Sequence, residues 1–224
     1  MRTFRTRATV PEIIDLGPEH YTSSEYDECL AMLAKIGRWL RGDRISLKAI
    51  SRYTPKTILD VGCGGGDFAH KLAKAFPQAH VLGMDIDSDA IARANRHFSR
   101  PNLTFKQGNI HDFSPQSFDV VTTTLVCHHL DDETLVPFVQ QLAKVAKNKV
   151  VINDLHRSKT AYVLFAMVSR LFFRNRLIWH DGLLSIQKGF KREDWETLFD
   201  KAKIAKENAC IAWKWPFRWY VEIG

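Results

Sequence analysis

The chain has 224 residues, of which 45% are hydrophobic and 25% are charged. This length and balance are typical of one globular domain with a full core, and no linker rich in Pro, Gly or Ser divides the chain. The net charge of +7 is compatible with an anionic partner, but no long run of Lys and Arg is interleaved with aromatic residues before the last residues of the chain. We therefore do not expect nucleic acid binding.

The four cysteines, at positions 29, 63, 127 and 210, form neither a CxxC pair nor the spacing of a zinc site. We therefore expect reduced thiols and a cytoplasmic location. Near the start of the chain, Pro11 and Glu12 interrupt the apolar segment that a secretory signal needs, so we expect a basic arm there.

The first expected element is a helix from Ser23 or Ser24 to about Leu40, where apolar residues recur at helical spacing and Gly42 follows as a breaker. Because this helix precedes the first expected strand, it is an addition to the sheet. It lies either over the site as a lid or against the edge of the domain. We expect residues 1–45 to form an arm and a cap helix, and residues 46–224 to form the main part of a single domain.

An apolar, β-prone run enters a glycine turn at residues 57–67, Thr-Ile-Leu-Asp-Val-Gly-Cys-Gly-Gly-Gly-Asp. Its glycines permit positive φ and leave no Cβ between the backbone and a ligand, and Asp67 is placed to cap a helix over 68–76. A dinucleotide fingerprint has a glycine where Asp67 stands, and a carboxylate there would repel a pyrophosphate. Together with Asp60, this carboxylate favours a ligand that carries an ammonium group.

Strand and helix signals alternate after this turn. A second strand, near 80–85, ends at Asp85, whose carboxylate can accept both hydroxyls of a ribose, and a helix follows over 88–98. Further strands are expected near 103–107, 118–124 and 149–155. The alternation predicts a parallel sheet wrapped by helices.

The last third of the chain predicts an apolar helix over 160–173, a short helix over 192–203, and β-rich runs at 205–213 and 217–223. The two runs turn at Trp215-Pro216 and predict an antiparallel hairpin that closes the sheet.

The apolar stretch 161–179 contains Arg170, Arg174 and Arg176, so it is too charged to span a bilayer. We expect it to be a core helix with one arginine-rich face. Alternatively, it lines a pocket for a hydrophobic substrate or makes weak contact with a membrane surface.

Four motifs together resemble the class I S-adenosylmethionine-dependent methyltransferases: Ile58 to Asp67, Gly83-Met-Asp-Ile-Asp87, Gly108-Asn-Ile110 and Phe118-Asp-Val-Val121. The resemblance implies a Rossmann-like α/β fold, with a seven-stranded, mostly parallel sheet, a C-terminal antiparallel hairpin, helices on both faces and an N-terminal helical cap. It also implies that residues 46–224 are the methyltransferase domain, with S-adenosyl-L-methionine as cofactor and S-adenosyl-L-homocysteine as product.

The cofactor residues that the resemblance implies are Asp60, Gly62, Cys63, Gly64, Asp85, Ile86, Asn109, Ile110, Leu125 and His129. Asp60 and the turn would hold the methionine end, Asp85 the ribose, and Asn109 with Ile110 the adenine. The family usually has Asp where Asn109 stands, but an Asn side-chain oxygen can also accept from the adenine amino group.

Methyl transfer to a phenol or enol needs a base, and ligands of open parallel sheets lie beyond the carboxyl ends of the strands. Two histidines are expected candidates for this base. His156 follows the fifth strand, and His180 stands beside Asp181, in what reads as a loop turn at Asp-Gly.

The segment 125–132, Leu-Val-Cys-His-His-Leu-Asp-Asp, contains His128 and His129 next to two aspartates. No metal is expected there, because adjacent side chains diverge and no further ligand is evident. One histidine is expected to pack beside the cofactor and the other to be structural.

Further segments, from Pro11-Glu-Ile-Ile-Asp15 to His180-Asp-Gly-Leu-Leu-Ser185, resemble bacterial small-molecule methyltransferases associated with polyketide or phenolic-lipid pathways. This implies O-methylation of a hydrophobic phenol or enol. C-methylation of a quinone-like acceptor and a non-catalytic, cofactor-binding regulatory protein remain the alternatives. The segment after the fourth strand has no Asn-Pro-Pro-Tyr-like run, which favours a small acceptor over nucleic acid or protein.

Overall fold

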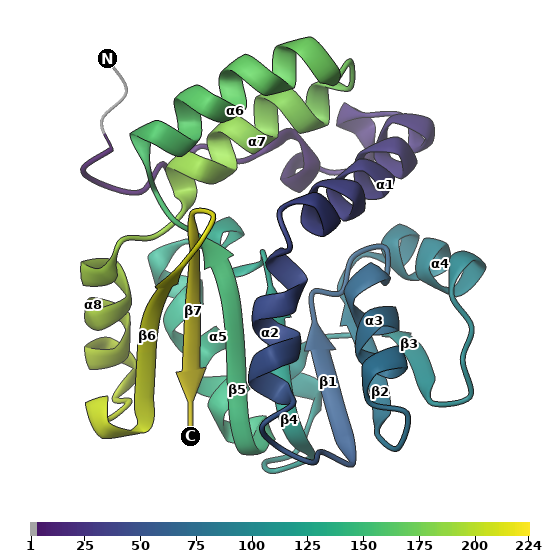
Figure 1. Ribbon diagram of the computed structural model, residues 1–224, viewed down its shortest axis with the longest axis vertical. Helices are drawn as coiled ribbons and strands as arrows, with labels where there is room; N and C mark the ends of the chain where they lie inside the picture. The colour runs from purple at the N-terminus through teal and green to yellow at the C-terminus, as the bar shows by residue number, and fades with distance from the viewer. Residues whose placement is uncertain (1–3) are drawn as a thin grey trace.

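A mixed sheet of seven strands forms the centre of the computed structural model, which describes residues 4–224 (Figure 1). The strand order is β3-β2-β1-β4-β5-β7-β6. The strands are β1 (Thr57–Val61), β2 (His80–Asp85), β3 (Leu103–Gln107), β4 (Phe118–Thr124), β5 (Ala146–Leu155), β6 (Ala209–Lys214) and β7 (Arg218–Ile223). Strands β1 to β5 pair in parallel, and β7 is antiparallel to both β5 and β6. The expected fold, with its C-terminal hairpin, is confirmed.

Helices cover both faces of this sheet because the central strands are apolar on both sides. The helices are α2 (Gly42–Ile50), α3 (Asp67–Ala75) and α4 (Ser88–His97) on one face, and α5 (Asp132–Val145) and α8 (Arg192–Ala202) on the other. Successive residues of one strand serve different cores, since side chains alternate along a strand. Val120 packs in the core with α2, α3 and α4, while Val121 packs with α5 and α8.

A helical cap stands over the carboxyl ends of the parallel strands (Figure 1). It consists of α1 (Ser23–Trp39), α6 (Lys159–Phe172) and α7 (Arg176–Lys188), with short 3-10 turns η1 (Ile13–Leu16) and η2 (Pro18–His20). The cap has a small core of its own, in which Cys29 of α1 meets Leu177 and Ile178 of α7. The cap is therefore larger than expected, because residues 159–188 add two helices to the N-terminal one.

The second cap segment corrects the sequence interpretation at His180. The Asp181-Gly182 step reads as a turn but lies inside α7. A Cβ on Gly182 would stand 2.5 Å from the ring of Phe165, so glycine lets α6 and α7 approach closely rather than ending a helix.

Helix ends differ from the expected ones in three places. Thr22, not Ser23 or Ser24, caps α1, with Glu25 completing a capping box. Gly66, with φ of 84°, takes the N-cap position of α3, so Asp67 is the first helical residue. Gly42, expected only as a helix breaker, is the first residue of α2, and Arg41 is its N-cap. The sequence interpretation missed this helix. This helix spans the boundary expected after residue 45, which stays a prediction.

The strand boundaries differ at two points. β5 begins at Ala146, earlier than expected, and β6 begins at Ala209 because a 3-10 turn, η5 (Lys206–Asn208), precedes it. Among residues 4–224, every helix is too short or too polar to cross a membrane.

Candidate functional site

A cavity of about 1680 Å³ opens between the carboxyl ends of the strands and the cap. Ligand pockets usually have roughly 300 to 1000 Å³, so this one has room for a cofactor and a second molecule. All ten residues expected to contact the cofactor line it, from Asp60 at the end of β1 to His129 after β4. The structure thus brings together side chains and backbone that four separate strand ends supply.

The glycine turn after β1 forms part of the cavity wall. Gly62, Gly64 and Gly66 have φ of 70°, 51° and 84°, which side chains with a Cβ rarely adopt. A Cβ on Gly62 would also stand 2.4 Å from a methyl group of Val126, in the segment after β4. Glycine is therefore required at Gly62 by both backbone conformation and space.

Asp85 connects the glycine turn to the end of β2. Its carboxylate accepts the backbone N–H of Gly64 at 2.8 Å and that of Asp87 at 3.0 Å. Burial raises the pKa of Asp85, although these hydrogen bonds lower it in part. A carboxylate has about four acceptor positions, so Asp85 keeps capacity for ligand hydroxyls. Asp87, not Asp85, caps α4.

Asp60 is a buried carboxyl group with an unsatisfied oxygen. Its side chain lines the cavity although the residue is only 1% exposed, and its Oδ2 has no hydrogen-bond partner among residues 4–224. Burial, with the charges of Asp43 and Asp85, raises the pKa of Asp60 well above its ordinary value. A buried polar atom without a partner is rare, and a ligand's ammonium group would satisfy this one.

The end of β3 leads to Asn109, whose side-chain oxygen caps a 3-10 turn, η3 (Ile110–Asp112), by accepting from the N–H of His111 at 3.1 Å. Ile110 is buried beside it, while Ile86 at the end of β2 is 72% exposed. Both isoleucines line the cavity, and they offer apolar contact to a flat ring.

The segment after β4 carries the two adjacent histidines on a 3-10 turn, η4 (Cys127–His129). His128 is buried, and its Nδ1 lies 2.7 Å from Oδ1 of Asp154. Arg7 donates to the carbonyl of Leu130 at 2.8 Å and fixes the same segment from the N-terminal arm. His129 lines the cavity, whereas His128 is buried against Asp154. The expected divergence of the two side chains is wrong, because their ring centroids lie 4.3 Å apart.

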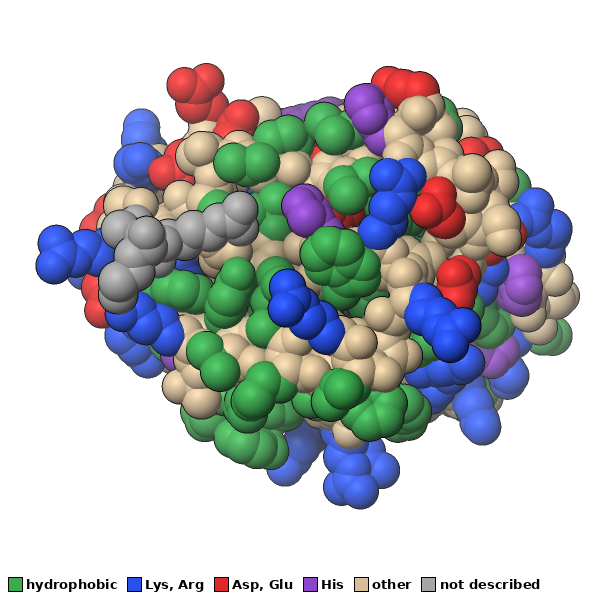
Figure 2. All heavy atoms as spheres, turned by 90° about the horizontal axis from the view of Figure 1, so that it is seen from above, with side chains coloured by type: hydrophobic (Ala, Val, Ile, Leu, Met, Phe, Trp, Pro, Cys, Tyr) green, Lys and Arg blue, Asp and Glu red, His purple; other side chains and the backbone are tan. Residues whose placement is uncertain are grey.

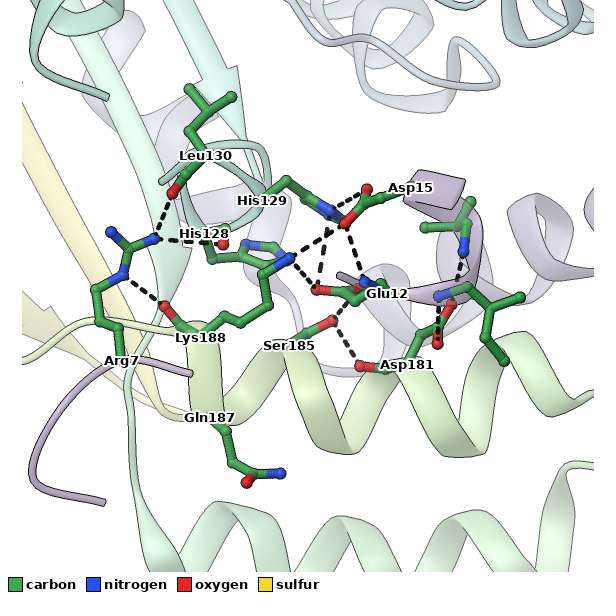
Figure 3. Close-up of polar contacts among 12 residues, drawn as sticks. Arg7, Glu12, Asp15, His128, His129, Leu130, Asp181, Ser185, Gln187 and Lys188 are labelled. Carbon is green, nitrogen blue, oxygen red and sulfur yellow. Dashed lines mark hydrogen bonds and ion pairs between the residues drawn. The ribbon is translucent and has the colours of Figure 1, made fainter. Parts of the chain in front are cut away.

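His129 belongs to a charged cluster that the sequence did not reveal (Figure 3). Its Nδ1 lies 2.7 Å from Oδ1 of Asp15, and Nζ of Lys188 lies 3.1 Å from Oδ2 of Asp15 and 3.3 Å from Oε1 of Glu12. Ser185 donates to the other oxygen of Glu12 at 2.7 Å. Asp15 is 114 positions from His129, and Lys188 is 173 positions from Asp15.

Nitrogen and oxygen atoms of Glu12, His128 and His129 lie within 4.8 Å of one another, as the ligands of a metal ion would. The ammonium group of Lys188 already pairs with Glu12 at this place. The cluster therefore has its own cation, and we propose no metal there.

Neither histidine expected to be the base lines the cavity. Nδ1 of His156 accepts from Nε1 of Trp213 at 3.1 Å, and its ring packs against Trp219 of the hairpin. Nδ1 of His180 lies 2.8 Å from Asp181, whose carboxylate accepts the N–H groups of residues 13 and 14. Because neither side chain faces the cavity, we do not propose either residue as the base.

The central part of the chain, residues 58–149, matches the family described as "Methyltransferase domain". The chain is 34% identical over 124 residues to the ubiquinone biosynthesis O-methyltransferase of Methylococcus capsulatus. This match covers 53% of this chain and 51% of that protein. It is 40% identical over 75 residues to the trans-aconitate 2-methyltransferase of Deinococcus radiodurans, covering 34% and 28% respectively. The chain thus spans about half the length, or less, of these curated relatives.

Solved structures of methyltransferases share the fold. Human N-acetylserotonin methyltransferase in complex with S-adenosylmethionine superposes with a TM-score of 0.67 at 15% identity, covering 90% of this chain and 56% of that one. The plantazolicin methyltransferase BpumL, in complex with S-adenosylhomocysteine and a triazolic desmethylPZN analog, gives a TM-score of 0.67 at 17% identity, covering 93% of this chain and 91% of that one. Residues 58–149 thus contain a methyltransferase domain, and the chain has the fold of methyltransferases solved with S-adenosylmethionine or S-adenosylhomocysteine.

Proposed function

We propose that the protein transfers a methyl group from S-adenosylmethionine to a hydrophobic small molecule, by O-methylation of a phenol or enol. The observation that carries this proposal is one cavity that contains all the expected cofactor residues and has space for a second molecule. The bound cofactor supplies an electrophilic methyl group. The chain's own residues hold the two molecules in register, which is the main catalytic task in such a reaction.

For the cofactor, we propose that Asp60 and the glycine turn hold the methionine end. Asp85 would accept the ribose hydroxyls, and Asn109 with Ile110 would contact the adenine. We further propose that Cys63, Ile86 and Leu125 complete this part of the wall. Support comes from the unsatisfied Oδ2 of Asp60 and from the spare acceptor capacity of Asp85.

For the acceptor, support comes from apolar side chains elsewhere on the cavity wall. Leu33 of α1, Val136, Phe138 and Leu198 line the cavity, and Leu30 of α1 lines it beside the glycine turn. The names of relatives support a small acceptor, since they include ubiquinone biosynthesis O-methyltransferases and a trans-aconitate 2-methyltransferase. C-methylation of a quinone-like acceptor and a cofactor-binding protein without transfer are the remaining alternatives.

We also propose that α6 gives the protein a weak contact with an anionic membrane surface. The helix exposes Val163, Leu164, Met167, Val168, Leu171 and Phe172, each at least 45% exposed. Figure 2, a view onto the cap, shows hydrophobic side chains gathered on this surface with Lys and Arg nearby. Residues 158–180 include no Asp or Glu, so the exposed apolar face of α6 carries no charge that anionic lipid would repel.

A cytoplasmic location belongs to the same proposal. It is supported by the cysteines, which are all free among the residues that the structure describes.

The experiment that tests the proposed function is transfer of labelled methyl from S-adenosylmethionine to a panel of lipophilic phenols, quinols, polyketide-like enols and bulk RNA. Products are identified by mass spectrometry. A methylated oxygen on a phenol or enol is the expected result. A methylated carbon supports the quinone alternative, labelled RNA contradicts the small-molecule acceptor, and cofactor binding without any product supports the regulatory alternative.

A further inference from the structure

The segment that carries His129 packs directly on the glycine turn. The space beyond Gly62 is filled by Val126, three residues before His129. Arg7 fixes the segment by donating to the carbonyl groups of Cys127, His128 and Leu130. The side chain of His129 is 28% exposed and lines the cavity. His129 is therefore held on a fixed support, next to the part of the wall proposed for the methionine end of the cofactor.

Asp15 determines which ring nitrogen of His129 is available. The 2.7 Å contact with Asp15 places the proton of a neutral ring on Nδ1 and leaves the lone pair on Nε2. A carboxylate that orients a histidine in this way also stabilises the imidazolium that forms when Nε2 takes a proton. This pairing is absent at His156, whose Nδ1 instead accepts from Trp213.

The charges around this pair keep Asp15 ionised. Burial raises the pKa of Asp15, but His129 and Lys188 outweigh it and lower the value to about 2. Burial also lowers the pKa of His129, while the hydrogen bond to Asp15 and the charges of Glu12 and Asp15 raise it overall, against the opposing charge of Lys188. His128, the other ring in contact, is bonded to Asp154. A base with a pKa near the working pH is effective in proton transfer.

We propose that His129, positioned by Asp15, is the general base for the acceptor hydroxyl; this inference rests on the proposed function. Nε2 of His129 takes the hydroxyl proton while the oxygen forms a bond to the transferred methyl carbon. The carbon–sulfur bond of the sulfonium breaks, and its electron pair stays on sulfur, which leaves neutral S-adenosylhomocysteine. The imidazolium then releases its proton to solvent. His129 thereby acts on the acceptor instead of holding the cofactor, and Asp15 is a positioning residue.

Two variants test the base by kinetics, His129→Gln and Asp15→Asn, with His80→Gln as the matched control. His80 is exposed at the opposite end of β2 from the cavity. With an ordinary phenol as acceptor, His129→Gln is expected to lower kcat about 100-fold or more while cofactor affinity, measured by calorimetry, stays unchanged. With a nitrophenol, which is already ionised at the assay pH, the same variant is expected to lose much less. Asp15→Asn should give a smaller loss and a shifted pH–rate profile.

A titration followed by NMR tests the pair without any turnover. The ring signal that disappears in His129→Gln is that of His129, and in the wild type it should titrate above the ordinary histidine value. In Asp15→Asn it should titrate lower, because the carboxylate that favours the imidazolium is lost. A His129 signal that does not respond to Asp15→Asn overturns the positioning role.

The outcomes separate the base from the proposed function. If the wild type transfers methyl groups to an ordinary phenol and His129→Gln does so at the same rate, the function stands and the base is overturned. If His129→Gln loses cofactor affinity, His129 is a cofactor contact and again not the base. If the wild type binds the cofactor but methylates nothing in the panel, the proposed function is contradicted. The role of His129 as base is then contradicted too, even if NMR shows that His129 responds to Asp15→Asn.

Discussion

The two walls of the cavity are built in different ways. The cofactor wall is made by turns that directly follow β1, β2, β3 and β4, so its residues lie within one stretch of the chain, 60–125. The opposite wall is assembled from the N-terminal arm and from α7, and it joins Asp15 to Lys188 across 173 positions. The first wall depends on backbone conformation at a few glycines, and the second depends on charge pairs between distant segments. Variants should therefore affect the two walls through different physical effects.

The largest effect is expected from Gly62→Val in the cofactor wall. A Cβ there would meet Val126 at 2.4 Å and would also require φ of 70°. Such backbone strain costs of order 1 to 3 kcal/mol, and the displaced turn should bind S-adenosylmethionine at least about 100-fold more weakly. Calorimetry measures the affinity. Gly37→Ala in α1, where a Cβ has ordinary contacts at 3.7 Å, is the control and should remain folded.

Asp85→Ala should have the next largest effect and tests whether the wall needs the side chain as well as the backbone. It removes the acceptor of the Gly64 N–H and the proposed ribose contacts. The expected loss of cofactor affinity is roughly 1.5 to 3 kcal/mol, which is the contribution of one hydrogen bond to a charged group. The control is Asp200→Ala on the exposed surface of α8. Unchanged affinity for Asp85→Ala would contradict the ribose assignment.

The charge pairs of the opposite wall should make stability depend on pH. The pKa of Asp15 is lowered from 3.8 to about 2 in the folded protein, so its contribution is present above pH 3.8 and is lost as the pH falls toward 2. The shift corresponds to roughly 2 kcal/mol before allowance for solvent screening at this partly exposed side chain. Denaturant unfolding between these pH values should show a steeper loss for the wild type than for Asp15→Asn. Equal slopes would show that the pair does not stabilise the fold.

The smallest effect on stability is expected outside the cavity, at α6. Leu171 and Phe172 are 79% and 71% exposed, so replacing both by Glu should change the free energy of unfolding by about 0.5 kcal/mol or less. The same double variant should sediment less with vesicles of anionic lipid, whereas Trp39→Glu on α1 should sediment like the wild type. Wild-type protein that does not sediment with the vesicles would contradict the membrane contact. So would a wild-type protein that self-associates and a double variant that does not.

The contrast between the walls also explains which features could be predicted from the sequence. The glycine turn, Asp60 and Asp85 form a local pattern in which strand, turn and helix signals agree, and all of them line the cavity as expected. The cluster around His129 could not be found this way, because no local signal links Lys188 to Glu12 or Asp15. The sequence interpretation used Pro11 to Asp15 only as part of the resemblance to a methyltransferase family. It missed α7 because Asp181-Gly182 is a typical turn dipeptide.

The position of His156 away from the cavity has a different physical reason. The side chain does follow the carboxyl end of β5, where ligands of parallel sheets are found. However, the adjacent strand is antiparallel, and the hairpin places Trp213 and Trp219 against the imidazole. A rule that holds for parallel neighbours does not extend to a strand with an antiparallel partner on one side.

The position of β7 between β5 and β6 has a consequence for the order of folding. Within residues 4–224, every ladder contact of β6 is made with β7, which follows it in the chain. β6 cannot join the sheet before β7 pairs with β5, so we expect the hairpin to enter as a unit, after β5 is in place. During refolding, amide protons of 209–223 should gain protection from exchange after those of 118–155, and a nascent chain that has not yet released β7 would leave the edge of β5 open to other strands.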